Sequence, residues 1–214
     1  MRIRRRKNAT DILLRDYQEF VVEHPETWQG KWKSVLNKEM LYAEFGAGKG
    51  RFITNKALQN PGILFVGVER EPEVLIKTAQ KALETMPPNL RLIHTDVADL
   101  EMVFAPGEVD RIFLNFSDPW PKRRHAARRL TSPGFLAKYE TMLAKKGEIH
   151  FKTDNQKLFL FSVKSFKTSG WTLLEEDHDY HIAPDSSDIM TEYEERFRLL
   201  GQPIYRLVAV KSRA

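Results

Sequence analysis

The chain has 214 residues, of which 42% are hydrophobic, so it can bury one substantial core. It contains no cysteine, which excludes disulfides, thiolate zinc sites and cysteine nucleophiles. No stretch approaches the roughly 20 apolar residues of a membrane span, and the basic start lacks the apolar segment of a secretory signal, so we expect a soluble, cytoplasmic protein.

The net charge of +5 is unevenly distributed along the chain. Ten basic residues form two clusters, which are Arg2, Arg4, Arg5, Arg6 and Lys7 at the start, and Lys122, Arg123, Arg124, Arg128 and Arg129 in mid-chain. In the rest of the chain, acidic residues outnumber basic ones. Such clusters favour a polyanionic partner, because each neutralised phosphate releases condensed counterions. The alternative is a solvated tail and an ordinary exposed loop.

The first forty residues contain two tryptophans and no clear strand. We interpret residues 1–40 as a basic extension that packs on a domain formed by residues 41–214. From Leu41 onward, short apolar runs alternate with helical patterns. The expected strands are 41–45, 63–69, 90–94, 111–115 and 148–153, and the expected helices are 51–60, 73–86, 133–144 and 156–169. This alternation predicts a parallel sheet with helices on both faces.

The pattern changes after Gly170. Residues 171–175 and 203–210 have the pattern of two closing strands, separated by a polar segment with no obvious crossover helix. Gly147 and Gly170 stand where helices are expected to stop, and Ser132 is an expected N-cap before a proline in the first turn.

A glycine-rich segment, Glu44–Gly50, follows the first expected strand and opens the first helix. Glycines let the backbone turn tightly and approach a ligand closely. The spacing is G-x-G-x-G, whereas a dinucleotide fingerprint needs its third glycine where Arg51 stands. A tight strand-to-helix turn without a ligand is the alternative.

Two carboxylates follow the next strands. Glu69 ends the second strand, where a carboxylate can accept hydrogen bonds from both ribose hydroxyls of a nucleoside. Asp96 lies just past the third strand and could receive the amine of an adenine. Helix capping or a loop position is the alternative for each of them.

The segment Asn115–Lys122 leaves the fourth strand at the carboxyl edge of the sheet, where open α/β folds place their ligands. Two prolines stiffen the turn, and Trp120 offers a flat face to a base or to a packing partner. A buried tryptophan with a capping Asp118 is the alternative. The basic residues that follow immediately favour a site, because they place phosphate-seeking charge beside it.

Two further polar stretches belong to the same edge of the sheet. Phe151–Asn155 ends the fifth strand, and Met190–Phe197 precedes the last one. Their carboxylates suit the amino groups of bases, since carboxylates accept hydrogen bonds from N–H donors. For the second stretch, the start of an amphipathic helix with solvated glutamates is the alternative.

Taken together, E-F-G-A-G-K-G, F-V-G-V-E, H-T-D-V, N-F-S-D-P-W-P-K, H-F-K-T-D-N and T-E-Y-E-E-R-F resemble the bacterial tRNA (guanine-N7-)-methyltransferase family, in order and spacing. The resemblance extends from about Arg2 to Val210. It implies a Rossmann-like class I methyltransferase fold, with a mostly parallel seven-stranded sheet, helices on both faces and an antiparallel final strand. It also implies methyl transfer from S-adenosyl-L-methionine to N7 of a tRNA guanosine, in the variable loop, forming 7-methylguanosine.

The resemblance also implies roles for individual residues. The expected S-adenosylmethionine site comprises Glu44, Gly46, Gly48, Glu69, Asp96 and Asp118, and Asp118 is also the expected catalytic residue. The residues expected to contact tRNA, from the resemblance and from the basic cluster, are Lys122, Arg124, Arg128, Arg129, Asp154, Thr191, Glu192, Tyr193 and Glu194. We expect no metal and no membrane partner, and a monomer or homodimer.

Guanine N7 carries a lone pair and no proton, so its methylation needs no general base. Asp118 is therefore expected to orient the base and to stabilise positive charge. Whether Asp118 or Asp154 holds the guanine edge stays open at this point. The alternatives are a methyltransferase that acts on another RNA position, a non-catalytic RNA-binding protein, and a NAD-dependent dehydrogenase, which Arg51 disfavours.

Overall fold

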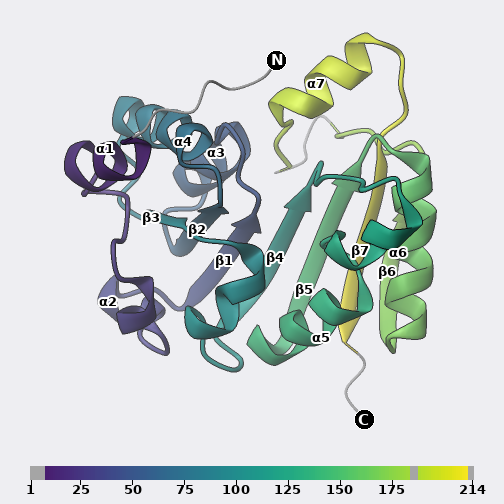
Figure 1. Cartoon of the computed structure of the whole chain (residues 1–214), viewed down its shortest axis with the longest axis horizontal. Coiled ribbons are helices and arrows are strands. Elements are labelled where there is room, and N and C mark those ends of the chain that lie inside the picture. Colours follow the sequence, from purple (N-terminus) through teal and green to yellow (C-terminus); the bar gives the residue numbers. More distant parts are fainter. Residues whose placement is uncertain (1–7, 184–187, 212–214) are drawn as a thin grey trace. The chain divides into compact units, whose positions relative to one another are not determined.

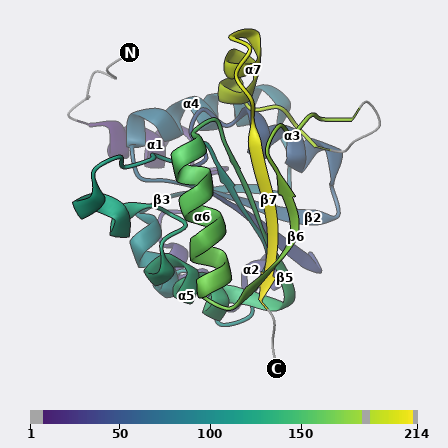
Figure 2. The same ribbon diagram turned by 90° about the vertical axis from the view of Figure 1, so that its right-hand side faces the viewer.

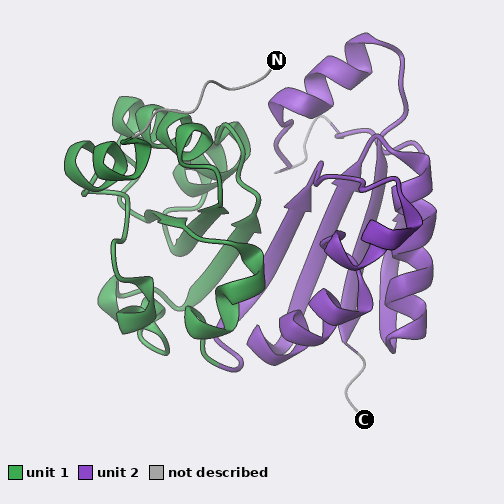
Figure 3. Ribbon diagram, in the orientation of Figure 1, with its two compact units in different colours: residues 1–105 green, residues 106–214 purple. Residues whose placement is uncertain are grey.

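A computed structural model describes residues 8–183 and 188–211 of the chain. The chain splits into two compact units, Met1–Ala105 and Pro106–Ala214 (Figure 3). The first basic cluster and most of the polar segment around residue 185 lie outside the described residues. Within the described residues, no helix combines the length and the apolar character that a membrane crossing requires.

Unit 1 is built on three parallel strands, β1 (Met40–Phe45), β2 (Ile63–Glu69) and β3 (Leu90–His94), in the order β3-β2-β1. Helices α3 (Arg51–Gln59) and α4 (Pro72–Thr85) connect them (Figure 1). The strands are continuous apolar runs, as in a parallel sheet that is covered on both faces. Their side chains form the core of this unit.

The described part of the first forty residues packs against α4 and the strands of unit 1. Its elements are α1 (Ala9–Asp16), η1 (Pro25–Trp28) and α2 (Trp32–Val35). Leu92 of β3 exchanges backbone hydrogen bonds with Phe20 and Val22, at 2.8 and 2.9 Å. The buried Trp32 donates its indole N–H to the Val103 carbonyl, at 2.9 Å, just after η2 (Val97–Met102). The domain boundary at residue 40 stays a prediction.

Unit 2 contains four strands in the order β4-β5-β7-β6. They are β4 (Val109–Asn115), β5 (Leu143–Thr153), β6 (Trp171–Asp177) and β7 (Tyr205–Lys211). Strands β4 and β5 run parallel, whereas β7 is antiparallel to both of its neighbours. The fold is thus a mostly parallel seven-stranded sheet with an antiparallel final strand, which confirms the prediction.

The described residues of unit 2 also form helices η3 (Arg123–Arg128), α5 (Pro133–Met142), α6 (Gln156–Thr168) and α7 (Glu192–Leu199). Helix α6 lies along β5, β6 and β7 and buries Phe159 and Phe166 (Figure 2). Helix α7 lies beyond the carboxyl ends of β4 and β5 (Figure 1). Side chains at the ends of these two strands can therefore reach α7.

The structure corrects two expectations about this unit. No obvious crossover helix was expected between the closing strands, and a helix start at Met190–Phe197 was only the alternative; that alternative is observed, because α7 forms there, capped by the Thr191 hydroxyl, which accepts from the Glu194 N–H at 2.9 Å. Gly147 was expected to stop a helix, but α5 ends at Met142 and Gly147 lies within β5. The β4–β5 register shifts beside it, between Val109 and Arg111, so the glycine belongs to a bulge.

Candidate active site

In unit 1, the glycine-rich turn between β1 and α3 has the backbone conformation that its sequence predicts. Gly46, Gly48 and Gly50 all have positive φ, at 81°, 60° and 83°. The N–H groups of Gly46 and Ala47 donate to the Val68 carbonyl at 2.8 and 2.9 Å, which fixes the turn to β2. A Cβ added at Gly46 would meet nothing within 4 Å. The turn therefore leaves open space directly beside its backbone.

Glu69 lies at the carboxyl end of β2 and is bonded to this turn. Its carboxylate accepts from the Gly48 N–H at 3.1 Å, and from the N–H groups of Arg70 and Glu71 at 2.9 and 3.0 Å. Burial raises the pKa of Glu69 above its ordinary value, although these three backbone donors oppose the shift. The side chain is thus held in one orientation beside the glycine turn.

The other two carboxylates expected in unit 1 differ in their surroundings. Glu44 is buried within β1, directly across from Gly67 of β2. Asp96 is exposed and caps η2, because its carboxylate accepts from the Ala98 N–H at 2.9 Å. The capping alternative that the sequence left open is therefore observed at Asp96. A cap uses one carboxylate oxygen and does not exclude a ligand at the other.

In unit 2, the turn after β4 has an unusual backbone. Phe116 and Trp120 both have positive φ, at 50° and 41°, and neither is a glycine. Each such residue costs on the order of 1–3 kcal/mol and persists only where its surroundings hold it. Asp118 lies between them and is exposed. The expected catalytic carboxylate therefore belongs to a strained turn.

Arginine side chains surround this turn. Arg129 donates from Nε to the Pro119 carbonyl at 3.1 Å and from Nη2 to the Trp120 carbonyl at 3.0 Å. The guanidinium of Arg128 lies 5.1 Å from the centre of the Trp120 ring, and His125 meets the same ring edge-on. Trp120 is half-buried and packs against the Arg128 guanidinium and the His125 ring, which is the packing-partner alternative that the sequence left open.

The basic cluster of unit 2 presents most of its charge to solvent. Lys122, Arg124 and Arg128 are exposed on or beside η3, whereas Arg129 is half-buried. Together with Arg123, the three exposed residues place four exposed cations within seven residues of chain, which suits a phosphate backbone. Among the described residues, no group of three His, Asp or Glu side chains could hold a metal ion.

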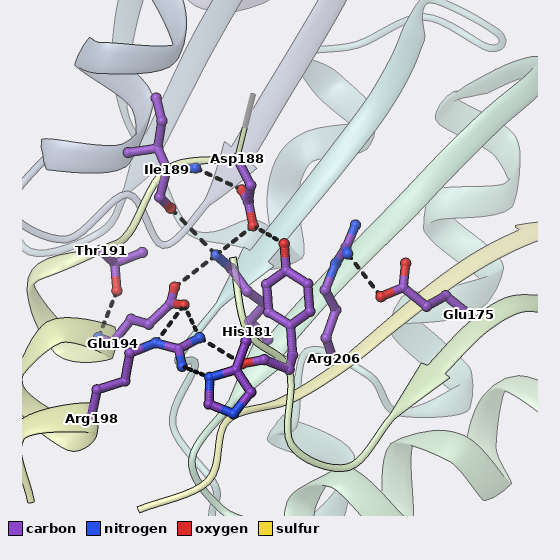
Figure 4. Close-up of polar contacts among 10 residues, drawn as sticks. Glu175, His181, Asp188, Ile189, Thr191, Glu194, Arg198 and Arg206 are labelled. Atoms are coloured by element: carbon purple, nitrogen blue, oxygen red, sulfur yellow. Dashed lines mark hydrogen bonds and ion pairs between the residues drawn. The ribbon is translucent and has the colours of Figure 1, made fainter. Parts of the chain in front are cut away.

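A buried ionic cluster holds α7 against the end of β5 (Figure 4). The Lys152 ammonium contacts Glu194 at 2.8 Å and Asp188 at 3.2 Å, and it also donates to the Ile189 carbonyl at 3.4 Å. Glu194 is fully buried and accepts a second time from Arg198, at 2.8 Å. Its carboxylate therefore serves a structural purpose before any ligand is present.

Asp188 is the second carboxylate of this cluster. Burial disfavours its charged form, but the Lys152 ammonium and hydrogen bonds from the Ile189 N–H and the Tyr180 hydroxyl hold its pKa below the ordinary value. For Tyr180, burial and the neighbouring Asp188 raise the pKa. Asp188 is therefore ionised at neutral pH.

Aromatic stacking also joins the turn after β4 to α7. The ring of Phe116 stacks on Tyr193 at 6.3 Å and on Phe197 at 6.1 Å, both with an interplanar angle of 19°. Tyr193 remains 46% exposed. Asp154, which follows β5, is half-buried, and burial raises its pKa. The turn after β4, the end of β5 and the start of α7 thus meet within unit 2.

Two residues of this region were not assigned a role from the sequence. Lys152 belongs to a recognised motif, but nothing in a single strand position signals that it binds Asp188 and Glu194, some forty residues away. Phe116 stands in the motif N-F-S-D-P-W-P-K, but the sequence alone assigned it no role. Its position between a strand and the expected catalytic residue was the available signal.

Comparisons with known proteins identify the family of the chain. A family model described as "Putative methyltransferase" matches residues 38–207. The tRNA (guanine-N(7)-)-methyltransferase of Bacillus licheniformis is 46% identical over 210 residues, which is 98% of each chain. The relative of the same name from Lachnoclostridium phytofermentans is 45% identical over the full length of both chains, and that from Bacillus subtilis is 45% identical over 207 residues. The chain belongs to the tRNA (guanine-N7-)-methyltransferase family. The family prediction is confirmed.

Solved structures show the same fold at low sequence identity. A 16S rRNA methyltransferase matches with a TM-score of 0.65 at 15% identity, covering 86% of this chain and 92% of that one. The 16S rRNA (adenine(1408)-N(1))-methyltransferase of Catenulisporales acidiphilia matches with a TM-score of 0.58, also at 15% identity, over 85% and 92% of the two chains. The predicted methyltransferase fold is therefore confirmed.

Proposed function

We propose that this protein transfers a methyl group from S-adenosyl-L-methionine to N7 of a guanosine in tRNA, forming 7-methylguanosine, and that the target is the variable-loop guanosine. One observation carries the proposal: relatives named for this activity match 96% or more of the chain at about 45% identity. We place the protein in the cytoplasm, where its tRNA substrate is made.

The residues of unit 1 fit S-adenosylmethionine. The open space beside Gly46 admits a ligand against the backbone, and Glu69 is held next to it, with its carboxylate suited to ribose hydroxyls. We propose Glu44, Gly48, Asp96 and Asp118 as further donor-binding residues, on the strength of the family's motifs. When bound, S-adenosylmethionine supplies a methyl group on a positively charged sulfur.

The chemical contribution of the chain centres on Asp118. The guanine N7 lone pair is free of a proton, so no side chain needs to act as a base. As N7 bonds to carbon, the base becomes positively charged, and a fixed carboxylate stabilises that charge more strongly than mobile water does. A carboxylate that accepts from the guanine N1–H and amino group would also orient N7. Both Asp118 and Asp154 remain candidates for this contact.

We further propose that tRNA contacts unit 2. Exposed Lys122, Arg124 and Arg128 suit its phosphates, and Arg129 belongs to the same cluster. The other proposed contacts are Asp154, Thr191, Glu192, Tyr193 and Glu194. Thr191 and Glu194 already cap and anchor α7, so part of their contribution is to hold that helix in place.

Nucleoside analysis tests the proposed function directly. Unmodified tRNA is incubated with the protein and S-adenosylmethionine, digested to nucleosides and analysed by mass spectrometry. We expect 7-methylguanosine to appear in proportion to the donor consumed. In a separate partial digest, the methylated tRNA fragment should be the one that spans the variable loop. Methylation of another nucleoside, or of no nucleoside with intact protein, would contradict the proposal.

A further inference from the structure

Arg129 differs from the other cations of its cluster in how its side chain is used. Lys122, Arg124 and Arg128 are exposed, but Arg129 is half-buried and directs two N–H groups at consecutive backbone carbonyls, those of Pro119 and Trp120. A guanidinium holds such a pair of acceptors with its planar fork, which a lysine ammonium cannot reproduce. This geometry leaves Arg129 poorly suited to bind a phosphate.

A third contact fixes the guanidinium from its flat side. Its central carbon lies 4.3 Å from the centre of the Phe161 ring on α6, the helix packed along β5, β6 and β7. Stacking on an aromatic face is favourable for a guanidinium and restricts it to one plane. Arg129 therefore connects the turn after β4 to a rigid helix of the same unit.

The turn needs such a connection, because its backbone is strained. Trp120 adopts a positive φ that side-chain-bearing residues rarely take, and its carbonyl is one of the two that Arg129 holds. Without the fork, the turn can relax toward commoner backbone angles. Asp118 directly precedes Pro119, so relaxation would displace its carboxylate.

We propose that Arg129 is a positioning residue for methyl transfer, which locks the Asp118–Trp120 turn against α6 instead of binding tRNA. The inference rests on the proposed function of Asp118. Two neighbouring arginines thus have different roles. Arg128 contributes charge to the tRNA interface, whereas Arg129 holds the backbone of the turn that carries Asp118.

The charge-conserving variant Arg129→Lys distinguishes the two roles. A phosphate contact survives this change, since a lysine also neutralises a phosphate. A positioning role does not. We expect the single-turnover rate at saturating tRNA and donor to fall about tenfold or more, while the slope of log K for tRNA against log salt keeps its parental value. Arg128→Gln should instead flatten that slope by roughly 0.7–0.9.

Two more variants complete the test. Phe161→Leu removes the stacking ring without altering any charge, and it should lower the single-turnover rate in the same direction, by about threefold. Lys164→Gln removes an exposed cation from the same helix and should leave the rate unchanged. Thermal unfolding and S-adenosylmethionine titration check that each variant is folded.

Two results would overturn the proposal. One is an Arg129→Lys enzyme with the parental single-turnover rate; the other is an Arg129→Gln enzyme that keeps this rate and loses as much salt dependence as Arg128→Gln. If Arg129→Lys does not fold, a parental rate in Phe161→Leu overturns it instead. If the parent enzyme forms no 7-methylguanosine, both the proposed function and this inference are wrong. If the parent is active and the Arg129 and Phe161 variants keep its rate, only the inference is wrong.

Discussion

The Lys152 ammonium lies 2.8 Å from the carboxylate of Glu194, with 4% and 0% of the two side chains exposed. This contact joins the carboxyl end of β5 to α7, although the two residues are about forty positions apart in the chain. A helix as charged as α7 has little apolar surface to hold it in place, so the ion pair and the stack on Phe116 take over that role.

The first prediction concerns this pair. Lys152→Met leaves the buried carboxylates of Glu194 and Asp188 without their shared cation, which should lower the free energy of unfolding by about 3–5 kcal/mol. The more exposed pair of Lys167 with Glu176 has a similar distance, 2.9 Å, and provides the matched control. Lys167→Met should cost about 0–1 kcal/mol. Equal losses in urea denaturation would contradict the structural role of the buried pair.

The second prediction concerns the donor site. Glu69→Gln keeps the size of the side chain but removes the charged acceptor for ribose hydroxyls, and it should weaken S-adenosylmethionine binding by about 1–3 kcal/mol. Burial raises the pKa of Glu69. As the pH is lowered, the affinity of the parent should therefore begin to fall at a higher pH than an ordinary carboxyl group would give. Calorimetric titration measures both effects. Glu84→Gln, an exposed glutamate of α4, is the control, and equal affinity in the two variants would remove Glu69 from the site.

The third prediction tests the electrostatic role of Asp118. Asp118→Asn should lower the single-turnover rate about a hundredfold or more, equivalent to about 2.7 kcal/mol, with a smaller effect on tRNA affinity. Since N7 has no proton to lose, the parental rate should show no ascending limb between about pH 6.5 and 9. A rise with a neutral pKa that disappears in the variant would argue for proton abstraction, and hence for another target atom.

The fourth prediction concerns the exposed cations. Changing both Arg124 and Arg128 to Gln should lower tRNA affinity and reduce the slope of log K against log salt by roughly 0.7–0.9 for each phosphate contact that is lost. Donor affinity should stay at the parental value. Filter binding over a salt series provides the measurement, and an unchanged slope would mean that these arginines are only solvated surface.

The fifth prediction concerns His150, which contacts Glu148 at 2.7 Å on β5. Burial lowers the pKa of His150, although Glu148 opposes the shift. Below the ordinary histidine pKa, the unfolded chain therefore binds a proton at His150 more readily than the folded protein does. The free energy of unfolding should fall as the pH drops below about 6.5, by up to about 1.4 kcal/mol per pH unit. His150→Asn should lose less stability between pH 8 and 5.5 than the parent. His24→Asn, at an exposed histidine, should behave like the parent.

The strands and most helices could be predicted because their signals are local. Buried parallel strands such as β2 are unbroken apolar runs, and the glycines of the turn after β1 specify its backbone directly. For helix α7 the local signal was weaker, so a helix start at Met190–Phe197 was offered only as an alternative. Its sequence is dominated by charge, and its anchor, Lys152, is remote in the chain.

For the candidate site, the sequence predicted which kinds of residue are present but not which contacts they make. The basic cluster predicted cations beside the turn, but nothing in five neighbouring basic residues showed that one guanidinium faces backbone carbonyls while others face solvent. Similarly, Asp96 precedes a helical turn that the sequence did not indicate, so its capping bond could be offered only as an alternative.

Gly50 has a consequence for how the donor site can respond to its ligand. A Cβ there would lie 2.5–2.9 Å from atoms of Thr78 on α4, and the Thr78 hydroxyl donates to the Gly48 carbonyl at 2.8 Å. The glycine turn and the middle of α4 are therefore in direct contact through Thr78, with no room between Gly50 and this residue for a further side chain. Any tightening of the turn around a bound donor must be transmitted to α4, so slower amide hydrogen exchange should spread along that helix, well away from the ligand itself.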